Sequence, residues 1–299
     1  MLKKLIRSTV GLTIAATAIL SLAACGGDET RTTAAADSGT QGAITVITRE
    51  DGSGTRGAFV EIVDITAGGN DNITMEAVVA PGTSVMMTNV AENPLAIGYA
   101  STGVALGDSR VRVLNIDGVA PTVENMLNGA YAIQRPFIIG YSTAEGLNPL
   151  AQDFVDFIFS AQGQGVVAGR GYVPVVPDGA PEYTPSGLTG TIVVNGSSSV
   201  NSLMEHLADA FRAVNPGVTI DIHGAGTGHG ITAVREGLAD IAMSSRDLRE
   251  SELEFLTPLS IAIDGIAVIA HPSNTVDGLT LEQVRNIFLG ETLRWENAR

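Results

Sequence analysis

The ten residues TREDGSGTRG (48–57) follow an apolar, strand-like run, 43–47, and precede an amphipathic helix. Gly52 and Gly54 let a ligand approach the backbone, and the start of the helix offers free N–H groups and the positive end of its dipole. A serine and a threonine add hydroxyl donors, and an arginine supplies a full positive charge. We interpret 48–57 as a loop that binds an oxyanion, the first anion loop. The residues expected to contact the anion are Arg49, Ser53, Gly54 and Thr55.

A second loop of the same kind lies far downstream, where an expected strand, Thr191–Val194, meets the sequence NGSSS (195–199). The helix that follows places its apolar residues at i, i+3, i+4 and i+7, the spacing of an amphipathic helix. We call 195–199 the second anion loop and expect Ser198 and Ser199 to contact the same anion. Two strand–loop–helix anion sites in one chain suggest two lobes that bind one ligand between them.

Residues 1–25 have the composition of a lipoprotein signal peptide. Positive side chains at the start precede an apolar stretch, Val10–Leu20, and the sequence LAAC (22–25) ends in the single cysteine of the chain. We expect cleavage before Cys25 and lipidation of its thiol, with a buried free cysteine as the alternative. The apolar stretch is shorter than the roughly 20 residues of a spanning helix. The mature protein is therefore expected to be extracytoplasmic and anchored to the cell membrane by lipid.

The charge of the chain narrows the choice of partners. The formal net charge is −15, and removal of the positive Lys3, Lys4 and Arg7 with the signal peptide would leave −18. Nucleic acid is therefore not an expected partner. Both lysines precede Cys25, so every positive side chain of the mature protein is arginine, which suits bidentate contacts with oxyanions.

Beyond the signal peptide, residues 26–42 are small and polar and cannot bury enough apolar surface to fold, so we predict a flexible tether. The remaining 43–299 are long enough for one two-lobed protein or two small domains. The helices expected there include 55–65, 149–168 and 231–238, and the strands include 218–222, 240–243 and 261–270. The stretch 174–190 is rich in proline and glycine and is expected to be a connector. Strands that alternate with helices predict an α/β protein.

Seven segments resemble those of the phosphate-binding proteins of phosphate ABC importers, and together they cover nearly all of 43–299. They are GSSS (196–199), GTG (226–228), DIAMSSR (240–246), LTLEQV (279–284) with Trp295, REDGSGTRG (49–57) of the first anion loop, NPLAIGY (93–99) and GYVP (171–174). The resemblance implies an α/β, two-lobed periplasmic-binding-protein-like (type II) fold with a ligand cleft between the lobes.

The order of these segments departs from the family. There the part like 190–299 precedes the part like 43–175, so this chain resembles a circular permutation in which the connector 174–190 joins the usual termini. Permutation is tolerated where the native termini lie close together and the cut falls in an exposed loop. The alternatives are a fragment, or a half-exchanged assembly in which complementary halves come from different chains.

Mapped onto the family, one lobe comprises 43–135 with 262–299, and the other comprises 137–261 including the connector. The chain would cross between the lobes at Arg135-Pro136-Phe137 and at Leu259–Asp264. Hinge closure is the expected response to the ligand.

The resemblance implies a set of contacts to phosphate from both lobes. One lobe supplies Arg49, Ser53, Gly54 and Thr55, and the other supplies Ser198, Ser199, Thr227 and Ser245. From the residues alone, Thr227 and Ser245 are typical helix caps. The family commonly has an aspartate in place of Ser245, which accepts the proton of hydrogen phosphate and repels sulfate, so the serine leaves selectivity open. Asp51 could replace that carboxylate, although we expect it to hold Arg49.

The expected function is to bind inorganic phosphate and deliver it to the membrane permease of a phosphate ABC importer, with no catalysis, cofactor or metal. The four histidines lack metal-ligand spacing, and the sequence has no HExxH, GxSxG or Walker lysine motif. His229, in the turn near Thr227, is the histidine that could line the cleft. The alternatives are a phosphate sensor that docks no permease, and a binder of another tetrahedral oxyanion, sulfate or molybdate.

Overall fold

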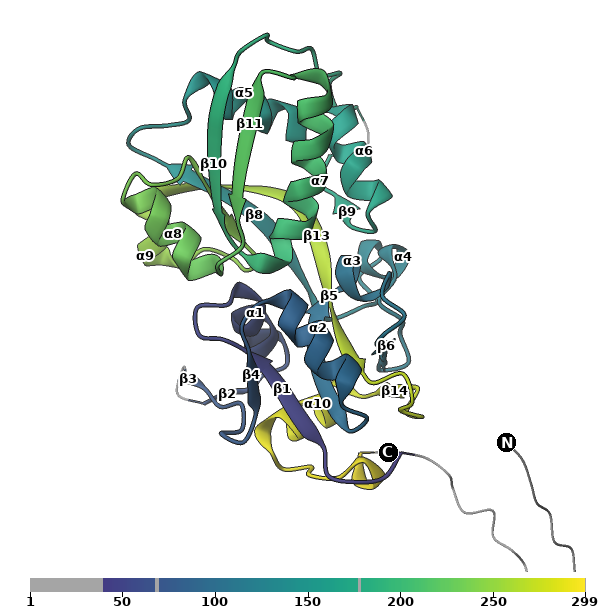
Figure 1. The fold of residues 1–299 in the computed structure, drawn as a ribbon. Helices are drawn as coiled ribbons and strands as arrows, with labels where there is room; N and C mark the ends of the chain where they lie inside the picture. Colours follow the sequence, from purple (N-terminus) through teal and green to yellow (C-terminus); the bar gives the residue numbers. More distant parts are fainter. Residues whose placement is uncertain (1–39, 68–69, 177–178, 299) are drawn as a thin grey trace, which may run out of the picture. The chain divides into compact units, whose positions relative to one another are not determined.

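A mixed sheet of ten strands runs through the part of the chain that the computed structural model describes, residues 40–67, 70–176 and 179–298 (Figure 1). Its strands are β1 (Thr45–Arg49), β4 (Val78–Ala80), β5 (Ala96–Ser101), β6 (Arg112–Val113), β8 (Gln134–Ser142), β9 (Val173–Pro174), β10 (Gly190–Gly196), β11 (Val218–His223), β12 (Ile241–Ser244) and β13 (Leu256–Ala270). Eight of them lie in the order β11-β10-β12-β8-β13-β5-β1-β4, while β6 and β9 pair with β13. The signal peptide expected at 1–25 and most of the tether lie outside the described residues.

Two smaller sheets and a series of helices complete the structure. The smaller sheets pair β2 (Thr66–Ala67) with β3 (Asn70–Asp71), and β7 (Asn115–Ile116) with β14 (Gly278–Leu279). The helices are α1 (Gly54–Ile62), α2 (Thr83–Glu92), α3 (Thr102–Ala105), α4 (Val123–Leu127), α5 (Pro149–Ile158), α6 (Ala161–Gly169), α7 (Ser198–Val214), α8 (Thr227–Arg235), α9 (Glu250–Leu253), α10 (Leu281–Leu289) and a 3₁₀ helix, Trp295–Asn297. None of the helices in the described ranges combines the length and the apolar character needed to cross a membrane.

Strands β8 and β13 connect the two largest apolar cores of the described residues. They pair antiparallel from Leu256 opposite Ser142 to Gly265 opposite Gln134. One core draws on the 137–262 part of the chain, and the other draws mostly on 46–133 and 266–298. Parallel strands flank the central pair on both sides, since β10 pairs in parallel with β11 and β12, and β1 with β4 and β5. The protein therefore has the two-lobed α/β fold that the sequence predicts.

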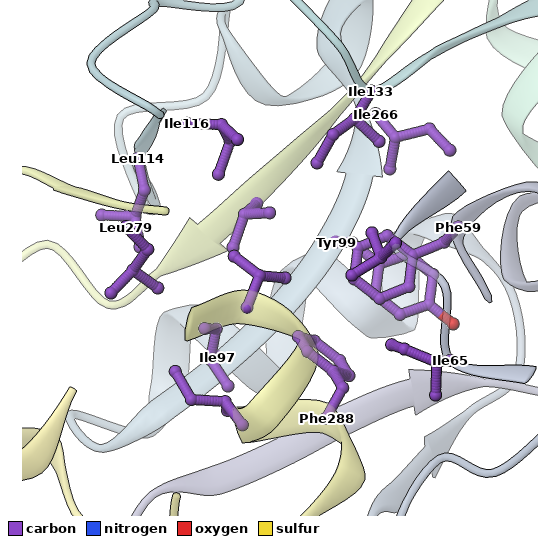
Figure 2. Close-up of a cluster of buried hydrophobic side chains, with 14 of the residues drawn as sticks. Phe59, Ile65, Ile97, Tyr99, Leu114, Ile116, Ile133, Ile266, Leu279 and Phe288 are labelled. Carbon is purple, nitrogen blue, oxygen red and sulfur yellow. The ribbon is translucent and has the colours of Figure 1, made fainter. Parts of the chain in front are cut away.

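Three aromatic side chains fix the core that holds the first anion loop. Phe59 of α1 stacks on Tyr99 of β5 with ring centroids 4.1 Å apart, and the ring of Phe288 of α10 meets Phe59 edge-on at 4.8 Å. Figure 2 shows the three rings together among the aliphatic side chains of this core. Because α1, β5 and α10 come from distant parts of the sequence, this cluster joins the two chain segments of the lobe.

The described N-terminal residues pair with the C-terminal segment. Thr40 N donates to Thr275 Oγ1 at 2.7 Å, Ile44 N donates to Leu293 O at 2.9 Å, and Trp295 N donates to Gly42 O at 3.0 Å. Thr40 and Gly42, which the sequence assigns to the tether, are thus hydrogen-bonded to this lobe.

The helix expected over 149–168 is two helices, α5 and α6. The break falls at Ser160, whose hydroxyl donates to Phe157 O at 2.6 Å and accepts from Gly163 N at 3.1 Å. This serine caps α6 instead of continuing α5, because its short polar side chain competes for backbone groups. The helix expected over 231–238 begins four residues earlier, at Thr227, and ends before Gly237.

We expect Phe59→Ala to lower the free energy of unfolding by about 3–5 kcal/mol, because it removes a buried ring from the aromatic cluster. The change is measured as a lower urea midpoint at unchanged m value. Leu253→Ala, at a side chain that is 45% exposed, is the control and should shift stability by less than about 0.5 kcal/mol. An effect of Phe59→Ala as small as that of the control would contradict the role of the cluster.

Candidate functional site

Both anion loops have the strand–loop–helix form that the sequence predicts. In the first, β1 ends at Arg49 and Ser53 caps α1, accepting from Arg56 N at 3.3 Å. In the second, β10 ends at Gly196 and Ser197 caps α7. Gly196 has a φ of 144°, and a Cβ there would lie 2.2 Å from Met243 O, so only glycine fits between β10 and β12.

The structure brings the two loops into direct hydrogen-bonding contact. Arg49 Nη2 donates to Ser198 Oγ at 2.9 Å, and the hydroxyls of Thr55 and Ser199 lie 2.8 Å apart. Gly228 N, in the first turn of α8, donates to Gly52 O at 3.2 Å. Hydrogen-bonding groups of the two lobes thus meet at one place.

Thr227 and Ser245 belong to the same cluster. Ser245 N donates to Thr227 Oγ1 at 3.4 Å, and Ser245 Oγ lies 3.4 Å from Thr55 Oγ1. A Cβ on Gly54 would lie only 2.3 Å from Thr227 Oγ1 and 2.7 Å from Ser245 Oγ, so a glycine is required where the lobes approach. The structure therefore gathers the eight residues of the expected site, with Ser53 present as the cap of α1.

Thr83 is a member of the cluster that the sequence analysis missed. Its hydroxyl lies 3.1 Å from Ser199 Oγ and accepts from Arg49 Nη1 at 3.3 Å, and its backbone N donates to Ser198 Oγ at 3.3 Å. Thr83 is the first residue of α2 and follows Gly82. The same glycine–threonine pair opens α8 at Gly226 and Thr227, so this repeated signal could have identified it.

The carboxylate that holds Arg49 is that of Glu50, not that of Asp51. Glu50 accepts from Arg49 Nε at 2.8 Å and from Arg49 Nη2 at 2.7 Å, and also from Gly82 N at 3.0 Å. Burial opposes ionisation of Glu50, but the hydrogen bonds from Arg49 and Gly82 outweigh it, so the pKa of Glu50 lies below its usual value. Asp51 lies in the turn before α1, where its side chain is 99% exposed and pairs with Arg56. Glu50 therefore fixes the guanidinium in place.

The hydrogen bonds around Ser245 fix the direction in which its hydroxyl points. Ser197 Oγ accepts from the N–H groups of Ser199 and Val200, which occupies its lone pairs, and donates to Ser245 Oγ at 2.8 Å. The proton of Ser245 must then point away from Ser197, and the Thr55 hydroxyl, 3.4 Å away, can serve it as either donor or acceptor. Ser245 therefore offers the site a donor, whereas a carboxylate at this position would offer an acceptor.

Several hollows of the described surface lie away from this cluster. One of about 470 Å³ is lined by Glu145, Asn148, Leu238 and Asp240, on the lobe that holds the second anion loop. Its two carboxylates make it unsuited to an anion. His229 is exposed and does not join the hydroxyl cluster through any of the described hydrogen bonds.

A family model for the PBP superfamily domain matches residues 28–162 and 181–298. The phosphate-binding protein PstS 2 of Streptococcus pneumoniae is 42% identical over 294 residues, which covers 96% of this chain and 98% of that protein. The crystal structure of a phosphate-binding protein of a phosphate ABC transporter from the same organism matches with a TM-score of 0.68 and 42% identity, over 86% of this chain and 100% of that one.

The relatives differ in how much of the chain they match. The single alignment with PstS 2 shows that its segments follow the same order as in this chain. The phosphate-binding protein PstS of Pseudomonas aeruginosa, 31% identical, matches over only 44% of this chain and 42% of its own length. A permuted order relative to that protein predicts a half-length match of this kind, and permutation stays a prediction. Its fold and these matches show that the chain belongs to the PBP superfamily, in the same family as PstS 2.

Proposed function

We propose that this protein binds inorganic phosphate between its two lobes outside the cytoplasm and delivers it to the permease of an ABC importer. The observation that carries the proposal is the convergence of Arg49 with the hydroxyls of both lobes in one cluster. The relatives that match this chain over most of its length are named phosphate-binding proteins, and the solved one belongs to a phosphate ABC transporter.

The helices support an anionic ligand. The cluster lies at the N-termini of α1, α2, α7 and α8, which begin at Gly54, Thr83, Ser198 and Thr227. Each N-terminus presents free N–H groups and a partial positive charge. An acidic chain repels anions at long range, so a local arrangement of dipoles around one arginine is what permits binding.

The strength of such a site is consistent with uptake from dilute solution. Micromolar affinity corresponds to about −8 kcal/mol, and hydrogen bonds to a charged group contribute roughly 1.5–3 kcal/mol each before the costs of association. Arg49 together with several hydroxyl and backbone donors is sufficient to reach it.

Binding is favoured over catalysis because the relatives are named as binding proteins and because the hydroxyls serve as caps and donors. A phosphatase would release phosphate from a phosphomonoester, which a colorimetric assay detects. We expect no turnover. The proposed lipid on Cys25 rests on the LAAC sequence alone. The proposed protein delivers phosphate to a permease, whereas a phosphate sensor would bind phosphate and dock no transporter.

We expect Arg49→Ala to weaken phosphate binding at least about a hundredfold, because it removes the positive charge and leaves the Glu50 carboxylate to repel the anion. Isothermal titration calorimetry of residues 26–299 with phosphate measures the change. Arg110→Ala is the matched control, since Arg110 is exposed and pairs with Asp108 on the surface. Wild-type affinity in Arg49→Ala would refute the site.

We expect sulfate to compete with phosphate in the wild-type protein, because Ser245 donates a hydrogen bond and does not repel a dianion. Ser245→Asp should weaken sulfate binding at least about tenfold more than phosphate binding, since a carboxylate accepts the proton of hydrogen phosphate and repels sulfate. Competition calorimetry gives both affinities. Ser245→Ala, the control, should weaken both anions by similar factors. Absence of sulfate competition in the wild-type protein, or an equal loss of both anions in Ser245→Asp, would contradict the role given to residue 245.

A further inference from the structure

A buried ion pair lies where the chain crosses between the lobes. Arg135 of β8 is the register partner of Asp264 of β13, and its Nη2 lies 3.3 Å from Asp264 Oδ2. Both residues are buried, with 3% and 0% of their surface exposed. On one side of the pair Phe137 belongs to one apolar core, and on the other side Ile133 and Ile266 belong to the other.

The pair is bonded to both lobes and to the anion cluster. Arg135 Nη1 donates to the backbone oxygen of Ser245 at 3.0 Å. Asp264 Oδ1 accepts from Ser101 Oγ at 2.9 Å and from Thr102 Oγ1 at 3.0 Å, where β5 ends and α3 begins. The guanidinium of Arg135 thus binds the backbone of Ser245, the residue whose hydroxyl belongs to the anion cluster.

The positive charge of Arg135 is only partly compensated. Its Nε is buried and has no hydrogen-bond partner among the described residues, and its contact with the carboxylate is a long one. Burial lowers the pKa of Arg135, and the nearby charge of Arg49 acts in the same direction, while Asp264 opposes both. Two arginines therefore repel each other across the site, and an anion placed there would relieve that repulsion.

We propose that Arg135 is a positioning residue for the anion, which supplies a second positive charge behind Ser245 and holds that residue in place, and that Asp264 limits how much of this charge the anion experiences. The inference rests on the proposed function. An ion pair that only joined β8 to β13 would stabilise the fold. Removing the charge of Asp264 would then not raise the affinity for the anion.

The test is Asp264→Asn, which keeps an oxygen acceptor for Ser101 and Thr102 but removes the negative charge. We expect the melting temperature without ligand to fall, and the affinity for phosphate to rise at least about threefold, because the anion then compensates Arg135. Thermal unfolding and isothermal titration calorimetry of the purified protein give the two values. The expected result is a lower melting temperature together with a higher affinity for phosphate.

Asp153→Asn is the matched control, since Asp153 is also buried and accepts from two hydroxyls, those of Tyr183 and Ser186, within the core of one lobe. It should lower the melting temperature without raising the affinity. If Asp264→Asn lowers the affinity or leaves it unchanged, as in the control, the inference is wrong. If the wild-type protein binds no phosphate at all, it is the proposed function that fails.

Variants of Arg135 test the same inference should Asp264→Asn not fold. Arg135→Gln should bind phosphate at least about tenfold more weakly, and Arg135→Lys, which keeps the charge, should recover most of that loss. In the Arg135→Gln background, Asp264→Asn should no longer raise the affinity. Wild-type affinity in Arg135→Gln, or equal losses in the glutamine and lysine variants, would overturn the role of the charge.

Discussion

The antiparallel pairing of β8 and β13 is the constraint on which the rest of this structure depends. Each strand leaves one apolar core and enters the other, so the two lobes share a backbone ladder as well as side-chain contacts. The ladder is irregular between Ser260 and Ala262, close to the crossing. The position of that crossing decides which helix N-termini face each other, and it places the buried Arg135 behind the hydroxyl cluster.

Electrostatics explains why the cluster is built from neutral donors around few charges. The chain carries a net charge of −15, and its anion site cannot rely on the general field of the molecule. Hydroxyls that cap helices have a fixed orientation because their oxygens are already occupied by backbone N–H groups, as Ser197 shows. Ser197 donates its proton to Ser245 Oγ, so the N–H groups of α7 act on the Ser245 hydroxyl through Ser197. Local capping therefore determines the chemistry that the ligand meets.

The parts of the site that could be predicted from the sequence are those specified by neighbouring residues. A strand, a glycine and a capping serine define the first and second anion loops, and both appear where expected. Thr83 was missed because the strand that precedes its helix, β4, has only three residues and carries little periodicity. The pairing of Arg49 with Glu50 could not be read either, since Asp51 lies only one residue further along and the turn geometry decides which carboxylate reaches the guanidinium. Contacts between the lobes depend on the crossing of β8 and β13, which no local pattern encodes.

The order of the segments matters less to this fold than their contacts do. The lobe that holds the first anion loop is assembled from both ends of the described chain, with Ile44 paired to Leu293 and Phe59 packed against Phe288. Whether or not a loop joins these two stretches, the strands and rings of this lobe remain in contact. The predicted permutation is therefore compatible with one shared site, because its cut avoids the two strands that cross between the lobes. The hydrogen bonds of residues 40–44 with the 275–296 segment hold these two stretches side by side, which is the proximity that the predicted permutation requires.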